Sequence, residues 1–310
     1  MDTGVRQKPA LSVVIASHNA EQTIQGCLSS LQSQQTDADF EIIVVDSSSD
    51  RTAQRVQEGF PEARLYHFAH RKFCGDARNV GVRESRGDII ALTDADCTVV
   101  GTWVDEILRA HRSPHLAIGG AIANAEPSGL VGWAAYFCEF SRWMPGSEPR
   151  SLDDIAGANM SYKKKAFDTY GSFIEGTYCS DSDFHWRLGR DGHLLWFVPR
   201  IVVSHHSIDS LRALVRHEFE HGACFARVRI KAEHFSRSRR LAYVILSPLI
   251  PFWILAKVAR NSLRNSTYLS NFVRALPLVV LGVVAWSAGE LVGYAQGRSR
   301  KTAALQRATG

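Results

Sequence analysis

Two aspartates separated by one residue follow directly on an apolar run. Asp94 and Asp96 lie in "GDIIALTDADCTVV", where Ile89 to Leu92 form a run that is typical of a buried strand. Residues i and i+2 of a strand point to the same side, so the two carboxylates would lie close together. Like charges at that distance are unfavourable unless a cation lies between them. The spacing therefore indicates a site at the end of this strand.

Three interpretations of this pair are open. An aspartate after a strand can cap the next helix or form an Asx turn. Two neighbouring carboxylates can also act as a catalytic acid and base. The third interpretation is a site for Mg²⁺ or Mn²⁺, a hard cation held by one or two carboxylates together with substrate phosphates. We favour the metal site, because other polar residues also follow strands, and a metal there would act as a Lewis acid on a leaving group.

The first hundred residues alternate between predicted strands and helices. The expected strands cover 11–17, 40–46, 63–68 and 88–94, and an expected helix over 74–86 precedes the last of them. Alternation with short connections predicts right-handed βαβ units and a mostly parallel sheet. Ligands of such sheets collect at the carboxyl ends of the strands. Four polar residues lie at these ends: Ser17, His18, Asp46 and Asp94.

The middle of the chain is less regular. Residues 113–155 mix Gly, Pro and Trp, and the segment from Ile155 then predicts a strand followed by a helix. "CSDSDFHWRLGRDG" predicts a short helix with acids at its start. "HLLWFVPRIVVSHH" predicts two strands broken by Pro199, because proline cannot donate to a strand ladder.

Composition places the main body of the chain among ordinary globular proteins. Of the 310 residues, 45% are hydrophobic and 22% are charged, with a formal net charge of +5. The six cysteines are scattered without a CxxC pair, which indicates reduced thiols in a reducing compartment. The N-terminus has no long apolar run of the signal-peptide type, so we expect the main body in the cytosol.

The last third of the chain contains its two most apolar segments. Residues 241–259 approach the roughly 20 residues that span a bilayer, but Pro248 and Pro251 interrupt them. Residues 275–295 are long enough but carry Glu290. A transmembrane hairpin, a pair of helices in the membrane interface and buried helices of a soluble subdomain are all open, and we favour membrane association.

A strongly basic helical segment, 211–240, precedes these apolar segments. A solvated charged helix is the simplest interpretation, and nucleic acid would be a usual alternative partner. The segment has few aromatic residues and leads directly into an apolar stretch. It therefore favours a membrane surface with anionic lipid rather than nucleic acid.

Four blocks of the chain together resemble family 2 glycosyltransferases. They are "LSVVIASHNAEQTIQGCLSSLQSQ", "FEIIVVDSSSDRT", "GDARNVGVRESRGDIIALTDADC" and "GANMSYKKKAFDTYGSF" followed by "CSDSDFHWRL". The likeness covers about residues 10–206. The family consists of inverting, nucleotide-sugar-dependent enzymes of the GT-A fold, so the resemblance implies that fold and activity.

The resemblance also implies individual roles. Donor-nucleotide binding falls on Ser17, His18, Asp46, Arg78 and Asp94, metal binding on Asp94, Asp96 and His205, and general-base catalysis on Asp181. Asp183 is the alternative base, because residues i and i+2 at a helix start point to different sides. A surface or hydrogen-bonded histidine is the competing interpretation of His205.

Two positions depart from the family pattern. Ser47 stands where the family often has a second aspartate, and Ser180 stands where it usually has a glutamate before the base. These departures leave a catalytically silent, sugar-nucleotide-binding scaffold at the membrane as one alternative. A nucleotidyltransferase is another alternative. That class is expected to have a Gly-rich loop with a basic residue after the first strand, and "SHNAEQT" has none.

We expect an α/β, GT-A-like fold: a mostly parallel twisted sheet flanked by helices, followed by a helical, membrane-associated C-terminal region. The expected parts are a catalytic domain over 8–210, a basic amphipathic connector over 211–240, a hydrophobic helical pair over 241–297 and a basic tail over 298–310. The expected reaction is Mg²⁺- or Mn²⁺-dependent transfer, with inversion, from a nucleoside-diphosphate sugar to a hydroxyl of a glycan or lipid-linked acceptor. Envelope or exopolysaccharide assembly at the cytoplasmic face of the membrane is the expected setting, without nucleic acid.

Overall fold

The computed structural model describes residues 8–125 and 129–297. The expected basic tail, 298–310, lies outside the described residues. The described residues divide into two compact units: unit 1 comprises 8–125 and 139–207, and unit 2 comprises 129–138 and 208–297. Unit 1 ends close to the boundary expected at residue 210. Residues 129–138, however, were expected in the first domain and belong to unit 2.

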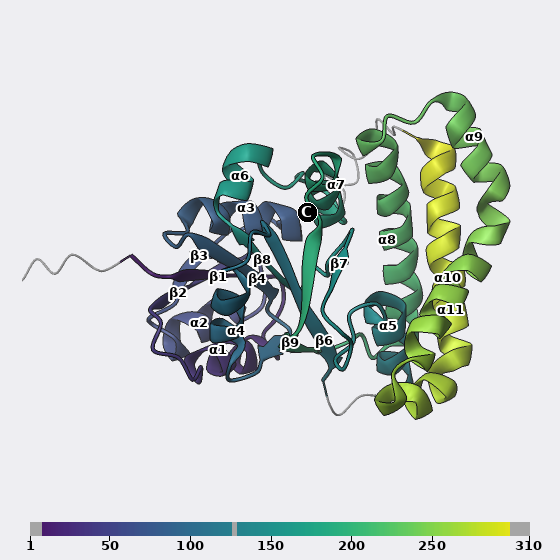
Figure 1. Ribbon diagram of the computed structural model, residues 1–310. Coiled ribbons are helices and arrows are strands. Elements are labelled where there is room, and N and C mark those ends of the chain that lie inside the picture. Colours follow the sequence, from purple (N-terminus) through teal and green to yellow (C-terminus); the bar gives the residue numbers. More distant parts are fainter. Residues whose placement is uncertain (1–7, 126–128, 298–310) are drawn as a thin grey trace, which may run out of the picture. The chain divides into compact units, whose positions relative to one another are not determined.

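A mixed nine-stranded sheet forms the centre of unit 1 (Figure 1). Its first half is parallel, in the order β3 (Arg64–His67), β2 (Phe40–Asp46), β1 (Leu11–Ser17) and β4 (Ile89–Asp94). The order continues with β8 (Asn159–Lys163), β6 (Ala117–Asn124), β9 (Leu195–His205) and β5 (Cys97–Val99), while β7 (Arg150–Leu152) pairs with β9. β8 runs antiparallel to both β4 and β6. The predicted α/β class with four N-terminal strands is confirmed.

Helices cover both faces of the sheet (Figure 1). One face carries α3 (Cys74–Glu84), α6 (Lys165–Tyr170) and α7 (Ser180–Arg190), whose apolar side chains share a core with alternate residues of β1, β2 and β4. The other carries α1 (Ile24–Gln32), α2 (Thr52–Gly59) and α4 (Trp103–Ala110). Gly81 lets α3 approach β1, since a Cβ there would lie 2.1 Å from Cγ1 of Val14. The apolar runs of β1, β2 and β4 are thus buried between two layers of helices. Their carboxyl ends lie at the same edge of the sheet because the strands are parallel.

The break expected at Pro199 is wrong. Residues 195–205 form one strand, β9, which runs parallel to β6. The register shifts inside it: Gly120 pairs with Val198, and Ala121 already pairs with Val202. The three intervening residues, including Pro199, leave the ladder as a bulge. A proline without an N–H is accommodated there because a bulged residue needs no ladder hydrogen bond.

Unit 2 is helical in the part that the structure describes. Its helices are α5 (Leu130–Phe140, whose last residues lie in unit 1), α8 (Leu211–Ala232), α9 (Arg237–Leu246), α10 (Ile250–Leu263) and α11 (Leu269–Gln296), with short 3₁₀ turns at Ser247–Leu249 and Ser266–Tyr268. On α5, Trp133 and Tyr136 are buried and contact Tyr268. Two stretches, Arg237–Leu263 and Ser266–Gln296, are long and apolar enough to cross a membrane by length and composition.

Candidate active site

The carboxyl ends of β1, β2 and β4 meet at one edge of the sheet. In the parallel register Ser17 lies opposite Asp46, and Ala16 lies opposite Asp94. Asp94 is the last residue of β4, and Asp96 lies in the turn after it, so the two aspartates do not alternate along one strand as expected. The side chains of both remain partly exposed, at 24% and 41%. They are accessible to a ligand from solvent.

A buried guanidinium connects the first aspartate to the second acidic segment. Nη2 of Arg78 lies 2.9 Å from Oδ1 of Asp94 and donates to the carbonyl of Gly157 at 3.0 Å. A Cβ at Gly157 would lie 2.6 Å from Oδ2 of Asp181 and 3.0 Å from Nη2 of Arg78, so these groups converge on a position with no side chain. Burial alone would lower the pKa of Arg78, but Asp94 above all raises it above its ordinary value. The structure thus brings Arg78, Asp94 and Asp181 together.

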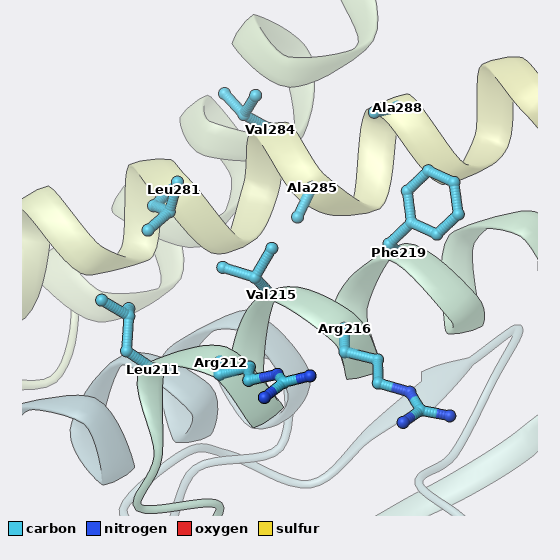
Figure 2. A pocket seen from close by; sticks show the side chains of 9 residues that line it. All are labelled: Leu211, Arg212, Val215, Arg216, Phe219, Leu281, Val284, Ala285 and Ala288. Carbon is cyan, nitrogen blue, oxygen red and sulfur yellow. The ribbon is translucent and has the colours of Figure 1, made fainter.

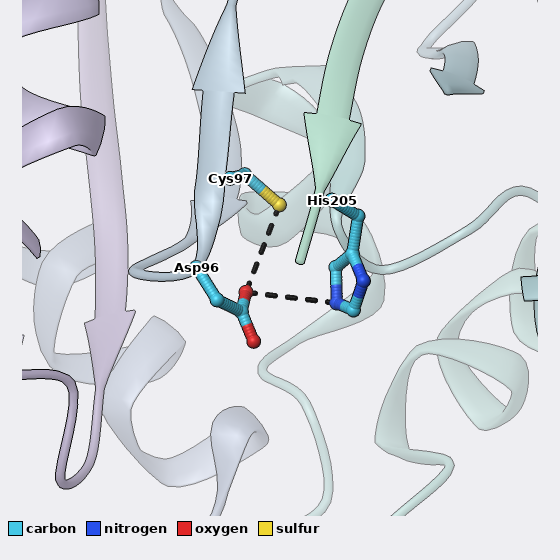
Figure 3. A group of neighbouring side chains, drawn as sticks. All are labelled: Asp96, Cys97 and His205. Carbon is cyan, nitrogen blue, oxygen red and sulfur yellow. Dashed lines mark hydrogen bonds and ion pairs between the residues drawn. The ribbon is translucent and has the colours of Figure 1, made fainter. Parts of the chain in front are cut away.

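The second aspartate has different neighbours. Oδ1 of Asp96 lies 3.6 Å from Nε2 of His205 and 3.8 Å from Sγ of Cys97 (Figure 3). Ligand atoms of these three residues all lie within 4.8 Å of one another. Although its side chain is 41% exposed, the loss of hydration at the sheet edge raises the pKa of Asp96; His205 lowers it and Asp94 raises it further. Burial also raises the pKa of the Cys97 thiol well above its ordinary value, so the thiol stays protonated.

These donors fit a hard divalent cation. Carboxylate oxygens with one imidazole suit Mg²⁺ or Mn²⁺, and a protonated thiol adds no anionic ligand. The buried Nδ1 of His205 has no hydrogen-bond partner among the residues that the structure describes. Asp96, with Asp94 and His205 beside it, is therefore the part of the edge that could hold a metal.

The nucleoside end of the expected site is more closed than predicted. Asp46 is fully buried, and its carboxylate accepts hydrogen bonds from Oγ of Ser48 at 2.5 Å and from Nδ1 of His67 at 2.8 Å. A base contact by Asp46 would require one of these partners to move. His18 is exposed, and its Nδ1 lies 2.9 Å from the carbonyl oxygen of Ser47. The buried hydroxyl of Ser17 has no partner within the described ranges.

The two candidate bases at the start of α7 differ in what they contact. Asp183 forms an ion pair with Arg187 at 3.1 Å, and Arg187 also donates to the carbonyl of Ser172 at 2.7 Å. Asp181 points instead to the position of Gly157, beside Arg78. Ser180 is buried, and its Oγ would lie 2.5 Å from a Cβ at Gly75, so this helix start packs tightly on α3. Of the two acids, Asp181 is the one beside the other site residues.

A buried chain of hydrogen bonds near Asp181 was not predicted from the sequence. Nδ1 of His185 lies 2.5 Å from Oδ1 of Asp154, and its Nε2 lies 2.6 Å from the hydroxyl of Tyr162. A carboxylate can only accept, so Nδ1 of His185 donates to Asp154. Ser182, next to Asp181, donates to Asp154 at 3.3 Å. Asp154 therefore steadies the first turn of α7, although it lies about thirty residues away in the chain.

The mixed, mostly parallel sheet with helices on both faces is GT-A-like, and its carboxyl edge gathers carboxylates and one buried guanidinium. Residues 12–171 match the model of the family "Glycosyl transferase family 2". The chain therefore belongs to glycosyl transferase family 2, and it is a glycosyltransferase that uses a nucleotide-sugar donor. The nucleotidyltransferase alternative is thereby excluded.

Individual relatives agree with this assignment. The chain is 27% identical over 206 residues to glycosyltransferase AglE of Haloferax volcanii, covering 64% of this chain and 67% of AglE. It is 22% identical over 185 residues to the glucosyl-dolichyl phosphate glucuronosyltransferase of the same organism, covering 54% of this chain and 56% of that enzyme. The mannosyltransferase PcManGT from Pyrobaculum calidifontis, solved with GDP-Man and Mn²⁺, has the same fold at a TM-score of 0.59 and 18% identity, covering 92% and 88% of the two chains.

Proposed function

We propose that the chain transfers a sugar, with inversion and with Mg²⁺ or Mn²⁺, from a nucleoside-diphosphate sugar to a hydroxyl of a glycan or lipid-linked acceptor. The convergence of Asp94, Arg78 and Asp181 on Gly157 carries this proposal. It supports the proposal because groups suited to the diphosphate, Arg78 and Asp94, and a carboxylate suited to the acceptor, Asp181, approach one another where Gly157 has no side chain. Asp183, held by Arg187, is set aside as the base.

The reaction needs one carboxylate and no second nucleophile. Asp181 takes the proton of the acceptor hydroxyl as its oxygen bonds to the anomeric carbon. The bond from that carbon to the diphosphate oxygen breaks, and its electron pair leaves with the nucleoside diphosphate. Attack from the face opposite the leaving group inverts the anomeric centre, through an oxocarbenium-like state. Arg78 keeps Asp94 in place throughout, because its guanidinium is buried and fixed at two points.

A divalent metal would supply Lewis-acid stabilisation of the departing diphosphate. Asp94, Asp96 and His205 are the residues that would hold it. PcManGT was solved with Mn²⁺ and a GDP-sugar, which supports a metal in the same fold. The name of the glucuronosyltransferase of H. volcanii includes a dolichyl phosphate, which supports a lipid-linked acceptor.

The setting that fits these features is the cytoplasmic face of a membrane. The apolar helices of unit 2 belong to the same chain as the catalytic residues, so attachment of unit 2 keeps unit 1 near membrane-bound acceptors. An acceptor of envelope or exopolysaccharide assembly suits that location. We assign 211–240 to the basic connector and 241–297 to the membrane-associated helices.

The test is turnover of UDP-, GDP- and dTDP-sugars with Mn²⁺, in detergent solution, by the wild-type chain, Asp181→Asn and Asp183→Asn. We expect Asp181→Asn to lower transfer or donor hydrolysis about a thousandfold, because the acceptor proton then has no base. Nucleotide binding, followed by thermal shift, should persist. Asp183→Asn is the matched control, since it changes the same side chain two residues away and should lower activity less than about tenfold.

Two results would overturn the proposal. Equal activity of Asp181→Asn and the wild type would show that Asp181 is not the catalytic base. Nucleotide binding without turnover, across the donor panel and glycan or lipid-linked acceptors, would favour a catalytically silent scaffold, the alternative that Ser47 and Ser180 raise.

A further inference from the structure

A stripe of large apolar side chains runs along one side of α9 and α10. Leu241, Ile245, Leu249 and Phe252 recur at intervals of three or four residues and are 59–72% exposed. Trp253 and Leu246 extend the stripe at 61% and 55%. Monomeric soluble proteins rarely expose a contiguous apolar patch of this kind, which marks an interaction surface.

The charges around this stripe are of one sign. Between Glu233 and Glu290 the sequence has no acidic residue and seven basic ones: Arg237, Arg239, Arg240, Lys257, Arg260, Arg264 and Arg274. The basic residues lie just before and just after the apolar stripe on α9 and α10. An apolar surface flanked by cations is complementary to an anionic lipid layer, whose headgroups carry the opposite charge.

The neighbouring helix α8 argues against a membrane crossing by α11. Leu214 of α8 lies near Gly282, and Ala226 lies 2.6 Å from where a Cβ of Gly293 would be, so the two helices run in the same direction. Gly222 fits against the carbonyl of Trp286 in between, where a Cβ would lie 2.1 Å from that oxygen. α8 therefore accompanies α11 closely from residue 282 to residue 293.

α8 carries charged side chains along this part of α11. Figure 2 shows Val215 of α8 pointing toward α11, while Arg212 and Arg216 point away from it on the same turns of α8. The side chain of Arg216 is 77% exposed and pairs with Glu220 at 2.8 Å. If α11 crossed a bilayer, these groups would lie in its hydrocarbon core, where charged side chains are unfavourable.

The parts of the apolar helices that do not run beside α8 are too short to cross a bilayer. The part of α11 before residue 282 has 13 residues, from Leu269 to Leu281, or about 20 Å of helix. On α9 and α10, the 16 residues between Arg240 and Lys257 amount to about 24 Å, with Pro248 and Pro251 among them. A hydrocarbon core is about 30 Å thick.

We infer that unit 2 lies in the interface of an anionic membrane, with the stripe on α9 and α10 among the acyl chains, and that neither apolar helix crosses the bilayer. The inference rests on the proposed membrane setting of the enzyme and gives that setting a specific form. The flanking basic residues contact lipid headgroups, and α8 stays on the aqueous side with its charges hydrated. The N- and C-terminal ends of both apolar helices then lie on one side.

Vesicle flotation of the full chain tests the surface. We expect binding to vesicles that contain phosphatidylglycerol to exceed binding to pure phosphatidylcholine about tenfold, and to weaken when NaCl rises from about 0.1 M to about 0.5 M. Leu246→Asp should lower binding about tenfold or more, since an exposed leucine that would enter the acyl chains is replaced by a charge. Leu194→Asp is the matched control, because Leu194 lies in unit 1 and is 54% exposed. Equal binding of the two variants would overturn the stripe as the contact.

Cysteine accessibility tests the topology. Ser266→Cys lies between α10 and α11, and Ser238→Cys lies at the start of α9; both serines are exposed. In inverted inner-membrane vesicles from expressing cells, a membrane-impermeant maleimide should label both positions to within about twofold. A transmembrane hairpin would place residue 266 on the far side, so protection of Ser266→Cys alone would overturn the inference.

Donor turnover in detergent solution separates this inference from the proposed function. Leu246→Asp should keep the wild-type rate of donor hydrolysis while it loses vesicle binding. Absence of donor turnover by the wild-type chain would refute the proposed catalytic function. The vesicle and labelling results would not be affected. Protection of residue 266 would refute the interfacial arrangement while the catalytic proposal stands.

Discussion

The two ends of the parallel half of the sheet hold carboxylates in opposite surroundings. At the amino end, Glu41 accepts hydrogen bonds from Ser12, Arg64 and Arg86 at 2.7–2.9 Å. At the carboxyl edge of the sheet, three acids, Asp94, Asp96 and Asp181, gather near one buried guanidinium, that of Arg78. At the amino end two arginines pair with one buried acid, and at the carboxyl edge three acids share one buried arginine. The first arrangement stabilises the fold, and the second leaves charge for a ligand to compensate.

Removal of Arg78 should have the largest effect on stability. Arg78→Gln leaves Asp94 and Asp181 without their cation, and loss of one partner of a buried pair destabilises by about 3–5 kcal/mol. We expect about 3 kcal/mol, because Asp94 is partly exposed. Urea unfolding measures the change. Arg83→Gln, on the same helix but 68% exposed, should change the free energy of unfolding by less than about 0.5 kcal/mol.

A double variant sharpens this prediction. Asp94→Asn combined with Arg78→Gln should recover part of the loss, since the uncompensated charge next to position 78 is then gone. If Arg78→Gln unfolds at the same urea concentration as the wild type, the carboxyl edge does not depend on a single cation.

The acids of the metal site should affect binding more than folding. Asp94→Asn or Asp96→Asn should weaken Mn²⁺-dependent nucleotide binding about tenfold or more, because an oxygen ligand loses its charge. Asp96→Asn should not lower Tm in the absence of metal, since burial and Asp94 already raise the pKa of this group and its charge is unfavourable there. Thermal shift with nucleotide, with and without Mn²⁺, measures both effects.

Asp88→Asn is the control, at the amino end of β4, the strand that ends at Asp94. Asp88 precedes β4, is 78% exposed and pairs with Lys8, so its replacement should leave metal-dependent binding unchanged. Normal donor binding by both site variants in the presence of metal would mean that Asp94 and Asp96 cap a turn, which is the structural alternative for this pair.

Local patterns predicted the parallel half of the sheet but not the rest. The apolar runs of β1, β2 and β4 and the aspartates behind them are continuous in the chain, so their common edge follows from strand pairing. The aromatic residues of α5 join Tyr268 across more than a hundred residues, and β5 and β7 have three residues each. Such elements depend on distant partners, which local periodicity does not reveal.

The candidate site shows the same division. The D-x-D spacing and the acids of α7 could be found from residue types and their positions. Three side-chain contacts could not be predicted, because each depends on side-chain directions after folding. They are Asp154 with His185, Asp46 with His67, and Asp183 with Arg187. The bulge at Pro199 is of the same kind, since its place in the ladder is set by β6.

At the amino end of β2, we expect the smallest effect of a substitution, and one that depends on pH. Burial alone would raise the pKa of Glu41, but the hydrogen bonds from Ser12, Arg86 and Arg64 hold it below its ordinary value. A carboxyl group with a lower pKa in the folded state binds fewer protons there than in the unfolded chain. Its contribution is therefore complete above the unfolded pKa and is lost as the pH falls through the folded one.

Glu41→Gln should lower the free energy of unfolding at neutral pH by about 1–3 kcal/mol, since a charged hydrogen-bond acceptor for two arginines is lost. The difference from wild type should shrink as the pH falls below the ordinary pKa of glutamate, because wild-type Glu41 then becomes protonated as well. Glu62→Gln, an exposed control in the loop before β3, should show neither effect. Urea unfolding from neutral to acidic pH measures all three chains. A gap between wild type and Glu41→Gln that stays constant across this range would show that the amino end is held by packing rather than by the charge of Glu41. The contrast between the two ends of the parallel strands would then no longer be one of charge.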